Sequence, residues 1–304
     1  MRRIVVFSLA LLLLATASFA REGEKPADGA PPPGPPASSG PLTFVKLEGG
    51  AVHQVATDLE KDGDFGVSRF FVQPGLDVFF SRELQTSFAL GYGLDRYDFD
   101  GRKGLAALEP WEDVDSLRLS ALARYSLDEA WTLFGVPVLS FAAERGARLT
   151  DGTTVGFYGG ASWKSTDGLT IGPGFGVFTE IEDSAVFFPF LLIDWQISER
   201  LAVRTGRGLA ATRGPGLVLA WEFADRWAIE AGGRWEQLRF RLDDDGAAPD
   251  GVGEEESIPL FAALTYELAE RSRVSLLGGV NLYGSVSLFD DRGRKLRIDL
   301  ESVE

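Results

Sequence analysis

Apolar residues recur at every second position through most of the chain from about residue 65 onward. The clearest segments are 86–94, 116–125, 258–268 and 274–288, in which one face is apolar and the other is small or polar. Side chains on a strand point alternately to opposite faces, so this period of two predicts amphipathic β-strands. No long segment has the period of a helix. The pattern therefore predicts an all-β chain.

Short and long connections alternate between these predicted strands. Six short turns lie at 81–84, 126–129, 165–168, 198–200, 224–226 and 269–272, and five longer connections lie near 95–114, 145–153, 181–185, 206–214 and 242–256. Outer-membrane barrels combine an even number of antiparallel strands with short periplasmic turns and longer outside loops. Segments of roughly 9 to 15 residues are long enough for a tilted strand to cross a bilayer. We predict an antiparallel transmembrane β-barrel of about twelve strands.

Aromatic residues agree with a membrane location. Six tryptophans lie in predicted strands: Trp131, Trp163, Trp195, Trp221, Trp227 and Trp235. Three of them are close to short turns, where an indole ring finds apolar contact and its N–H finds water at the lipid headgroups. The alternative is that the rings fill the core of a soluble protein. Long strands with charged opposite faces favour the membrane girdle.

The N-terminal region divides into three parts before the barrel. Residues 1–20 have two arginines, an apolar run and small residues before a cleavage point, which predicts a signal peptide. Residues 21–41 are rich in proline and predict an extended or disordered linker. Residues 42–64 are a lead-in segment, and the predicted barrel occupies 65–304. A signal peptide followed by a predicted transmembrane barrel predicts a location in the cell outer membrane.

Five prolines lie inside predicted strands: Pro74, Pro137, Pro173, Pro189 and Pro259. Proline lacks the N–H that a strand donates to its neighbour, so it usually lies at an edge or a bulge. A closed barrel has no edges. We therefore expect bulges at these points, or long strands that are really two shorter ones, and the strand count has a margin of about two.

Composition excludes several kinds of chemistry. The chain has no cysteine, so disulfides, thiol nucleophiles, thiolate metal sites and a lipoprotein anchor are absent. The formal net charge of −15 becomes −17 when Arg2 and Arg3 leave with the signal peptide. Such an acidic chain is a poor partner for nucleic acid or for an anionic membrane surface.

No catalytic, cofactor-binding or metal-binding residues are predicted. His53 is the only histidine and precedes the clear strands, so it is poorly placed for the Ser–His chemistry of an outer-membrane lipase. One histidine cannot build a histidine-based zinc site. The sequence therefore predicts a protein that is not an enzyme.

Acidic residues gather at both ends of the connection 242–256, as Asp243-Asp244-Asp245 and Glu254-Glu255-Glu256. Facing carboxylates can hold calcium or bridge lipopolysaccharide through divalent ions. Their spacing matches no calcium-binding loop, so a solvated, self-repelling loop is the better interpretation.

Charged residues on the polar strand faces are the strongest functional candidates. A charge that faces lipid near the bilayer midplane costs about 2–4 kcal/mol for Arg or Lys. These residues are therefore expected to face the lumen, where they either form a salt-bridged plug or line a pore. The candidates are Arg118, Arg124, Lys164, Asp194, Glu222, Glu230 and Arg234.

Several segments resemble a family of uncharacterised bacterial outer-membrane β-barrel proteins. They are Asp64-Phe65-Gly66-Val67, the strand 88–94, the turn 197–201 and Gly278-Gly279-Val280-Asn281, and the resemblance covers roughly residues 60–290. It implies the barrel fold, but no activity and no functional residues. Such barrels usually end in a strand with a terminal Phe, whereas this chain stops at Val303-Glu304.

Three functions are compatible with these observations. The first is a porin-like channel or transporter for small solutes in outer-membrane lipid. The second is a structural or adhesion barrel without transport. The third is a soluble periplasmic lipocalin-like binder, in which the apolar faces would be shut inside the molecule.

Overall fold

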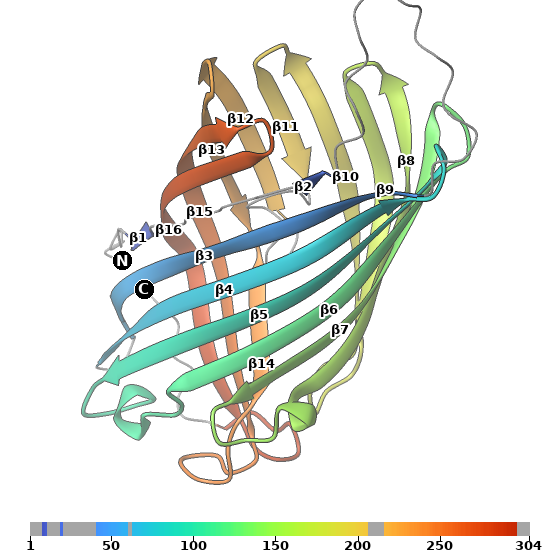
Figure 1. Cartoon of the computed structure of the whole chain (residues 1–304). Coiled ribbons are helices and arrows are strands. Elements are labelled where there is room, and N and C mark those ends of the chain that lie inside the picture. The colour runs from blue at the N-terminus through green and yellow to red at the C-terminus, as the bar shows by residue number, and fades with distance from the viewer. Residues whose placement is uncertain (1–7, 11–18, 21–40, 60–62, 206–215, 297–304) are drawn as a thin grey trace, which may run out of the picture.

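In the computed structural model, a single rolled β-sheet contains most of the described residues, which are 8–10, 19–20, 41–59, 63–205 and 216–296 (Figure 1). Its main strands are β3 (Leu42–Asp58), β4 (Asp64–Phe79), β5 (Leu84–Asp100), β6 (Asp113–Ser126), β7 (Trp131–Glu144), β8 (Thr153–Thr166), β9 (Leu169–Phe178), β10 (Val186–Ser198), β11 (Leu201–Thr205), β12 (Gly216–Ala224), β13 (Trp227–Arg234), β14 (Glu236–Arg241), β15 (Val252–Ala269) and β16 (Ser272–Phe289). Two short 3-10 helices are present, η1 (Ala106–Leu108) and η2 (Leu149–Gly152). Within these ranges no helix is long and apolar enough to cross a membrane.

Consecutive strands pair in antiparallel fashion from β3 to β13, both β13 and β14 pair with β15, and β15 pairs with β16, which confirms the predicted all-β, antiparallel fold. Two short strands, β1 (Ser8–Ala10) and β2 (Phe19–Ala20), add to β16 and β3 respectively. The rest of the predicted signal peptide and nearly all of the predicted linker lie outside the described residues. No pairing between β3 and β16 occurs in the described part of the chain.

The fourteen strands from β3 to β16 exceed the predicted twelve for two local reasons. Residues 42–58 of the expected lead-in segment form β3, which pairs along its length with β4, from Leu42 opposite Phe79 to Asp58 opposite Asp64. The predicted strand near 227–241 is divided at Trp235 into β13 and β14.

The two ends of the sheet differ as the alternation of connections predicted (Figure 1). One end, here the short-turn end, carries the tight turns such as 80–83 and 127–130. The other, the loop end, carries the long connections, including 101–112 and 242–251. Both of these connections are shorter than predicted, because β5 continues to Asp100 and β15 begins at Val252.

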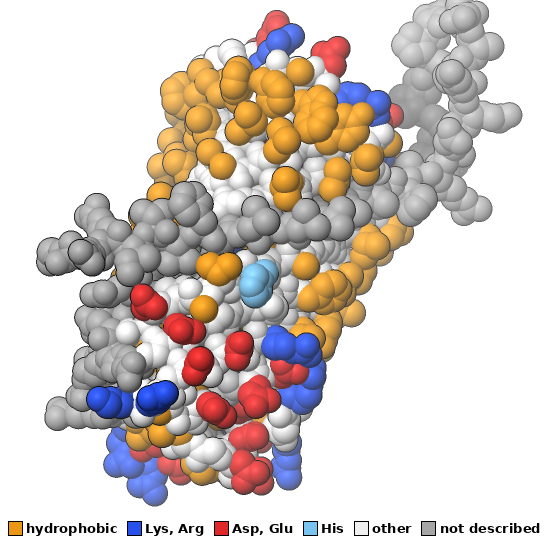
Figure 2. Space-filling view, turned by 90° about the vertical axis from the view of Figure 1, so that its left-hand side faces the viewer, with side chains coloured by type: hydrophobic (Ala, Val, Ile, Leu, Met, Phe, Trp, Pro, Cys, Tyr) orange, Lys and Arg blue, Asp and Glu red, His pale blue; other side chains and the backbone are white. Residues whose placement is uncertain are grey.

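A belt of exposed apolar side chains surrounds the half of the sheet nearer the short turns (Figure 2). On β10 the outward positions from Phe187 to Ile197 are exposed except for Ile193, which is partly buried, and Phe187 is 64% accessible. Ten steps of about 3.3 Å, tilted by about 40°, give a belt about 25 Å high. This height matches the hydrocarbon thickness that a barrel strand crosses.

Tryptophans mark the edge of the belt at the short-turn end. Trp131, Trp163, Trp195, Trp221 and Trp227 are all exposed on the outer surface. The rings of Trp131 and Trp163 stack across β7 and β8 with centroids 6.3 Å apart. The sixth predicted girdle residue, Trp235, instead lines the interior, because the strand breaks there.

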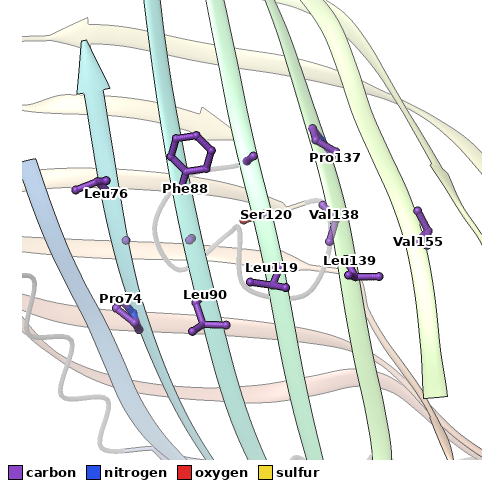
Figure 3. A pocket seen from close by; sticks show the side chains of 13 residues that line it. Pro74, Leu76, Phe88, Leu90, Leu119, Ser120, Pro137, Val138, Leu139 and Val155 are labelled. Atoms are coloured by element: carbon purple, nitrogen blue, oxygen red, sulfur yellow. The ribbon is translucent and has the colours of Figure 1, made fainter. Parts of the chain in front are cut away.

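The strand prolines cause little distortion. A strand residue directs its N–H and C=O to the same neighbouring strand, so a proline disturbs pairing on one side only. Pro74 pairs with Leu47 on β3. Between β4 and β5 no pairs form at Pro74 and the residue before it, and the register is the same on both sides of this gap. Pro137 behaves likewise between β6 and β7 (Figure 3). Among the five, only Pro259 lies at a register shift, so the expected bulge is correct there alone.

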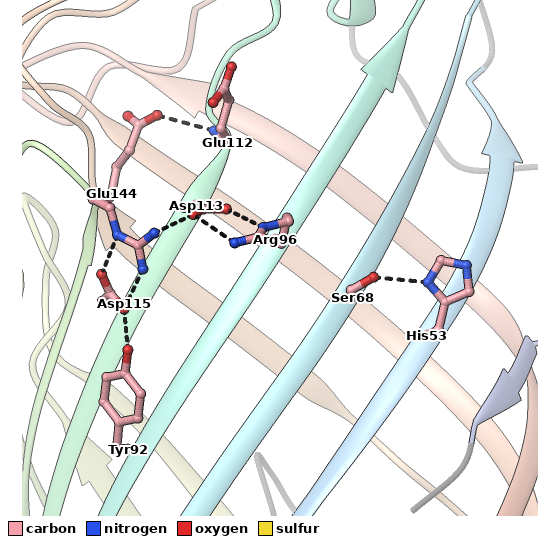
Figure 4. A network of polar contacts seen from close by, with 9 residues as sticks. His53, Ser68, Tyr92, Arg96, Glu112, Asp113, Asp115 and Glu144 are labelled. Carbon is pink, nitrogen blue, oxygen red and sulfur yellow. Dashed lines mark hydrogen bonds and ion pairs between the residues drawn. The ribbon is translucent and has the colours of Figure 1, made fainter.

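Beyond the belt, toward the loop end, the outer surface becomes charged (Figure 2). Arg96 of β5 bonds Asp113 of β6 at 3.0 Å, and Arg145 contacts both Asp113 and Asp115 (Figure 4). Tyr92 donates its hydroxyl to Asp115 at 2.6 Å. The long strands therefore extend past the apolar belt into a polar environment.

Candidate lumen binding site

The loop end of the rolled sheet is filled by an apolar core. This loop-end core consists of Leu59, Phe65, Val67, Tyr97, Leu105, Ala106, Trp111, Val114, Ala142, Phe240, Leu242, Ala248, Val286 and Leu288. Phe240 is 0% accessible and meets Trp111 edge to face with centroids 5.1 Å apart. Such interdigitated rings exclude water. The inner and outer faces thus exchange roles along β4 and β5: in the part beyond the belt, apolar side chains point inward.

Strand β14 closes the loop end by crossing to the opposite wall. It continues the pairing of β13 with β15, but its Arg241 also pairs with Ala143 of β7. At the loop end, β14 therefore contacts β7 directly, and the strands that lie between them in the sheet order do not separate them there. The loop-end core lies in the narrower tube that results.

A buried ionic cluster lies against the loop-end core. Arg69 of β4 binds Asp95 of β5 at 3.1 Å and also binds Glu255 of β15. The hydroxyl of Tyr97 donates to Glu255 at 2.6 Å. The prediction that 254–256 belong to a solvated loop is therefore wrong: they lie on β15, and Glu255 is 6% accessible. Arg69, which comes from a distant part of the sequence, compensates its charge.

A second arginine joins β14 to the connection after β9. Arg239 contacts Glu180 at 3.2 Å, Glu254 at 3.2 Å and Asp183 at 3.4 Å, and its side chain is 7% accessible. Burial raises the pKa of the Glu180 carboxyl, and Arg239 opposes that shift. The backbone N–H of Ser184 lowers the pKa of Asp183. This ion cluster holds the 179–185 connection against β14.

The loop-end core and the two ion clusters together form the seal of the barrel. Between this seal and the short turns lies the lumen cavity, of about 1320 Å³. One wall, built by β3 to β6, is polar. Its lining residues include Lys46, Glu48, Gln73, Asp77, Arg118 and Arg124. Lys46 and Asp77 form an ion pair across β3 and β4.

The facing wall, built by β7 to β10, is aromatic. Its rings include Phe134, Tyr158, Phe178, Phe188 and Phe190. Tyr158 lies 4.6 Å from Phe178 and 6.0 Å from Phe188, centroid to centroid. Glycines on neighbouring strands make room for these rings: a Cβ at Gly174 would be 2.4 Å from Phe190, and one at Gly176 would be 2.5 Å from Phe188. The cavity is therefore amphipathic.

The structure places four of the seven predicted lumen residues in this cavity: Arg118, Arg124, Asp194 and Arg234. The other three, Lys164, Glu222 and Glu230, are not among its lining residues. Lys164 binds Asp167 at 2.9 Å beside a short turn, and Glu222 is exposed near another. They lie toward the short-turn end, where the polar face is open to solvent.

Sequence reasoning did not identify the aromatic wall or the Lys46–Asp77 pair. Lys46 lies in the segment expected to be a lead-in. The rings at 188 and 190 alternate with exposed Phe187 and Pro189, so both faces of β10 are apolar and periodicity alone does not assign the lumen face. The glycine at every second position of β9 was the available signal, since it indicates a crowded inner face.

His53 lies on β3, on the outer surface, and not ahead of the strands as the sequence suggested. Its Nδ1 is 2.9 Å from the Ser68 hydroxyl of β4 (Figure 4). The prediction that His53 precedes the strands is therefore wrong, because the expected lead-in segment forms β3. No carboxylate hydrogen bond to His53 is found in the described part of the chain. Nor do the described residues contain a group of three His, Cys, Asp or Glu side chains suited to a metal ion.

Comparisons with known proteins give few matches. No family model matches the sequence, including any for the family it resembles, and no curated protein matches. The siderophore receptor PirA from Pseudomonas aeruginosa is 10% identical with a TM-score of 0.26, over 95% of this chain and 74% of that one. The siderophore receptor PiuA from Acinetobacter baumannii is 8% identical with a TM-score of 0.27, over 97% of this chain and 66% of that one.

Proposed function

We propose that this protein is an outer-membrane β-barrel whose lumen takes up a small amphipathic, anionic solute. The observation that carries the proposal is the lumen cavity of about 1320 Å³, which lies between a polar wall with Arg118 and Arg124 and a wall lined by aromatic rings. Binding cavities combine an apolar lining with a few placed polar groups in this way.

The membrane location rests on the exposed apolar belt and its tryptophan edge. Large exposed apolar patches are rare on soluble monomers. A soluble lipocalin-like binder would place Phe187, Leu191 and Trp221 inside, whereas all three are at least half exposed. Surrounding lipid accounts for these residues.

The filled loop end supports a gated or binding barrel over an open pore. The loop-end core and the Arg69 cluster occupy the interior between the cavity and the long connections. Ions crossing the barrel would have to pass through packed rings. A structural barrel without any solute is compatible with the seal, but it does not account for the amphipathic cavity.

The ligand proposal is tested with 2-naphthalenesulfonate, which joins an aromatic ring to an anion, by calorimetry on protein in lipid nanodiscs. Binding is expected for the unmodified protein. It is expected to weaken about tenfold in Arg124→Gln, the loss of about 1.4 kcal/mol that removing a charged hydrogen bond produces. Arg271→Gln, in a short turn, is the matched control. Equal binding by both variants, or none by the unmodified protein, contradicts the proposal.

A further inference from the structure

The outer wall of the barrel contains an apolar groove of about 720 Å³ within the belt (Figure 3). This outer groove runs across β4 to β8 and is lined by Pro74, Gly75, Leu76, Phe88, Ala89, Leu90, Leu119, Ser120, Ala121, Pro137, Val138, Leu139 and Val155. Apart from the hydroxyl of Ser120, its lining side chains are apolar. Because the groove lies in the belt, hydrocarbon surrounds it in the proposed orientation.

The wall beneath this groove is thin. Five residues, Gly75, Phe88, Ala89, Ser120 and Val138, line both the outer groove and the lumen cavity. Small side chains meet there: Gly75 is opposite Ala89, and Ala89 is opposite Ser120. Little more than backbone therefore separates the lumen from the lipid.

The pairing of strands is interrupted on both sides of the thin wall. Between β4 and β5 no pairs form at Pro74 and the residue before it, and between β6 and β7 none form at Pro137 and the residue before it. Proline supplies no N–H to these ladders. Separation of β4 from β5 at Pro74 therefore breaks fewer hydrogen bonds than separation at a fully paired stretch of the same ladder, and the small side chains of Gly75 and Ala89 face each other on this seam.

The lumen side of the thin wall is charged. Lys46 lies opposite Gly75 in register, and it pairs with Asp77. Arg118 lies on β6 two residues from Ser120 and lines the same cavity. An acyl chain suits the groove and an anionic head suits the lumen, so a molecule with both parts matches the two sides of the wall.

From this juxtaposition we propose that the thin wall, opening between β4 and β5 at Pro74, is a lateral passage for a single-chain anionic amphiphile of the fatty-acid class. The acyl chain occupies the outer groove and the carboxylate reaches the lumen cavity. This inference rests on the proposed uptake of an amphipathic solute and names its class and its route. The hydrocarbon environment of the groove selects an acyl chain as the occupant, since a protein segment there would bring backbone polar groups into lipid.

The passage is tested by closing it with a disulfide. Position 90 is opposite position 74 by the register on either side of the gap, and opposite residues in an antiparallel pair have Cα atoms about 4.5–5.5 Å apart, within the range of a disulfide. The chain has no cysteine, so Pro74→Cys/Leu90→Cys forms a single tether. Leu264→Cys/Leu276→Cys, an exposed and opposed pair on β15 and β16, is the matched control.

The readout is photolabelling by stearate with a mid-chain diazirine, in phosphatidylcholine vesicles, mapped by mass spectrometry. We expect labelling of Leu90 and Leu119 in the groove and of Tyr158 and Phe188 in the lumen. The tether is expected to lower lumen labelling about tenfold, equivalent to about 1.4 kcal/mol. Reduction in place should restore it, which separates closure from misfolding, and the control tether should have no effect.

Two results would overturn the passage. One is lumen labelling that the 74–90 tether leaves unchanged, since the amphiphile would then enter from the short-turn end and the proposed function would stand. The other is labelling spread evenly over the belt with none in the lumen. If naphthalenesulfonate still binds in that case, only the passage fails; if it does not bind, the proposed function fails as well.

Discussion

Phe240→Ala is expected to destabilise the barrel by about 3–5 kcal/mol, the range for removing a fully buried phenylalanine. Phe240 is 0% accessible and contacts Trp111 and Tyr97 in the loop-end core. Deletion of the ring leaves a cavity that the rigid strands around it cannot fill. The free energy is measured by reversible urea unfolding in phospholipid vesicles, followed by tryptophan fluorescence. Phe80→Ala, at the short-turn end and 56% exposed, is the matched control with a smaller loss.

The same substitution tests the seal. In planar bilayers the unmodified protein is expected to pass no steady current, because the loop-end core closes the lumen. Phe240→Ala is expected to produce intermittent conductance, while Phe80→Ala remains closed. Steady current through the unmodified protein would falsify the sealed lumen and restore the porin-like interpretation.

Arg69→Met is expected to cost about 3–5 kcal/mol, because it leaves the carboxylates of Asp95 and Glu255 buried without their cation. Both carboxylates are nearly inaccessible, at 2% and 6%. The comparison is Arg96→Met, which breaks the exposed Arg96–Asp113 pair and is expected to cost about 0–1 kcal/mol. Urea unfolding in vesicles measures both.

A triple variant distinguishes lost charge compensation from lost packing. Arg69→Met combined with Asp95→Asn and Glu255→Gln removes all three charges and keeps the side-chain volumes close. Much of the stability is expected to return, since replacement of a whole buried ionic cluster is far less costly than removal of one partner. If Arg69→Met alone costs no more than Arg96→Met, the cluster does not stabilise the loop end.

Local chemistry was sufficient to predict the strands and their connections. Side-chain alternation in 86–94 and 274–288 identified β5 and β16, and turn residues located the connections between them. The number of strands was harder to predict from the sequence. β3 has exposed Val45 and Leu47 on its outer face, but glycine and charge in the same segment weaken the alternation.

The lumen was predicted only in part for a related reason. Alternation assigns a residue to a face, and it assigns Arg118 and Arg124 to the inner face, where both line the lumen cavity. It does not give the height of a residue along the barrel, so Lys164 and Glu222 were grouped with them although they lie near the open short-turn end.

The amino-acid sequence alone determined that this protein is a chain of antiparallel amphipathic strands with short turns at one end and long connections at the other, because period and turn chemistry act between near neighbours. Only the tertiary structure decided that the loop end is sealed and that Glu255 is buried. Arg69 and Glu255 are 186 residues apart, and Phe240 meets Trp111 across the tube. Such partners are brought together by the rolling of the whole sheet, which no local pattern contains.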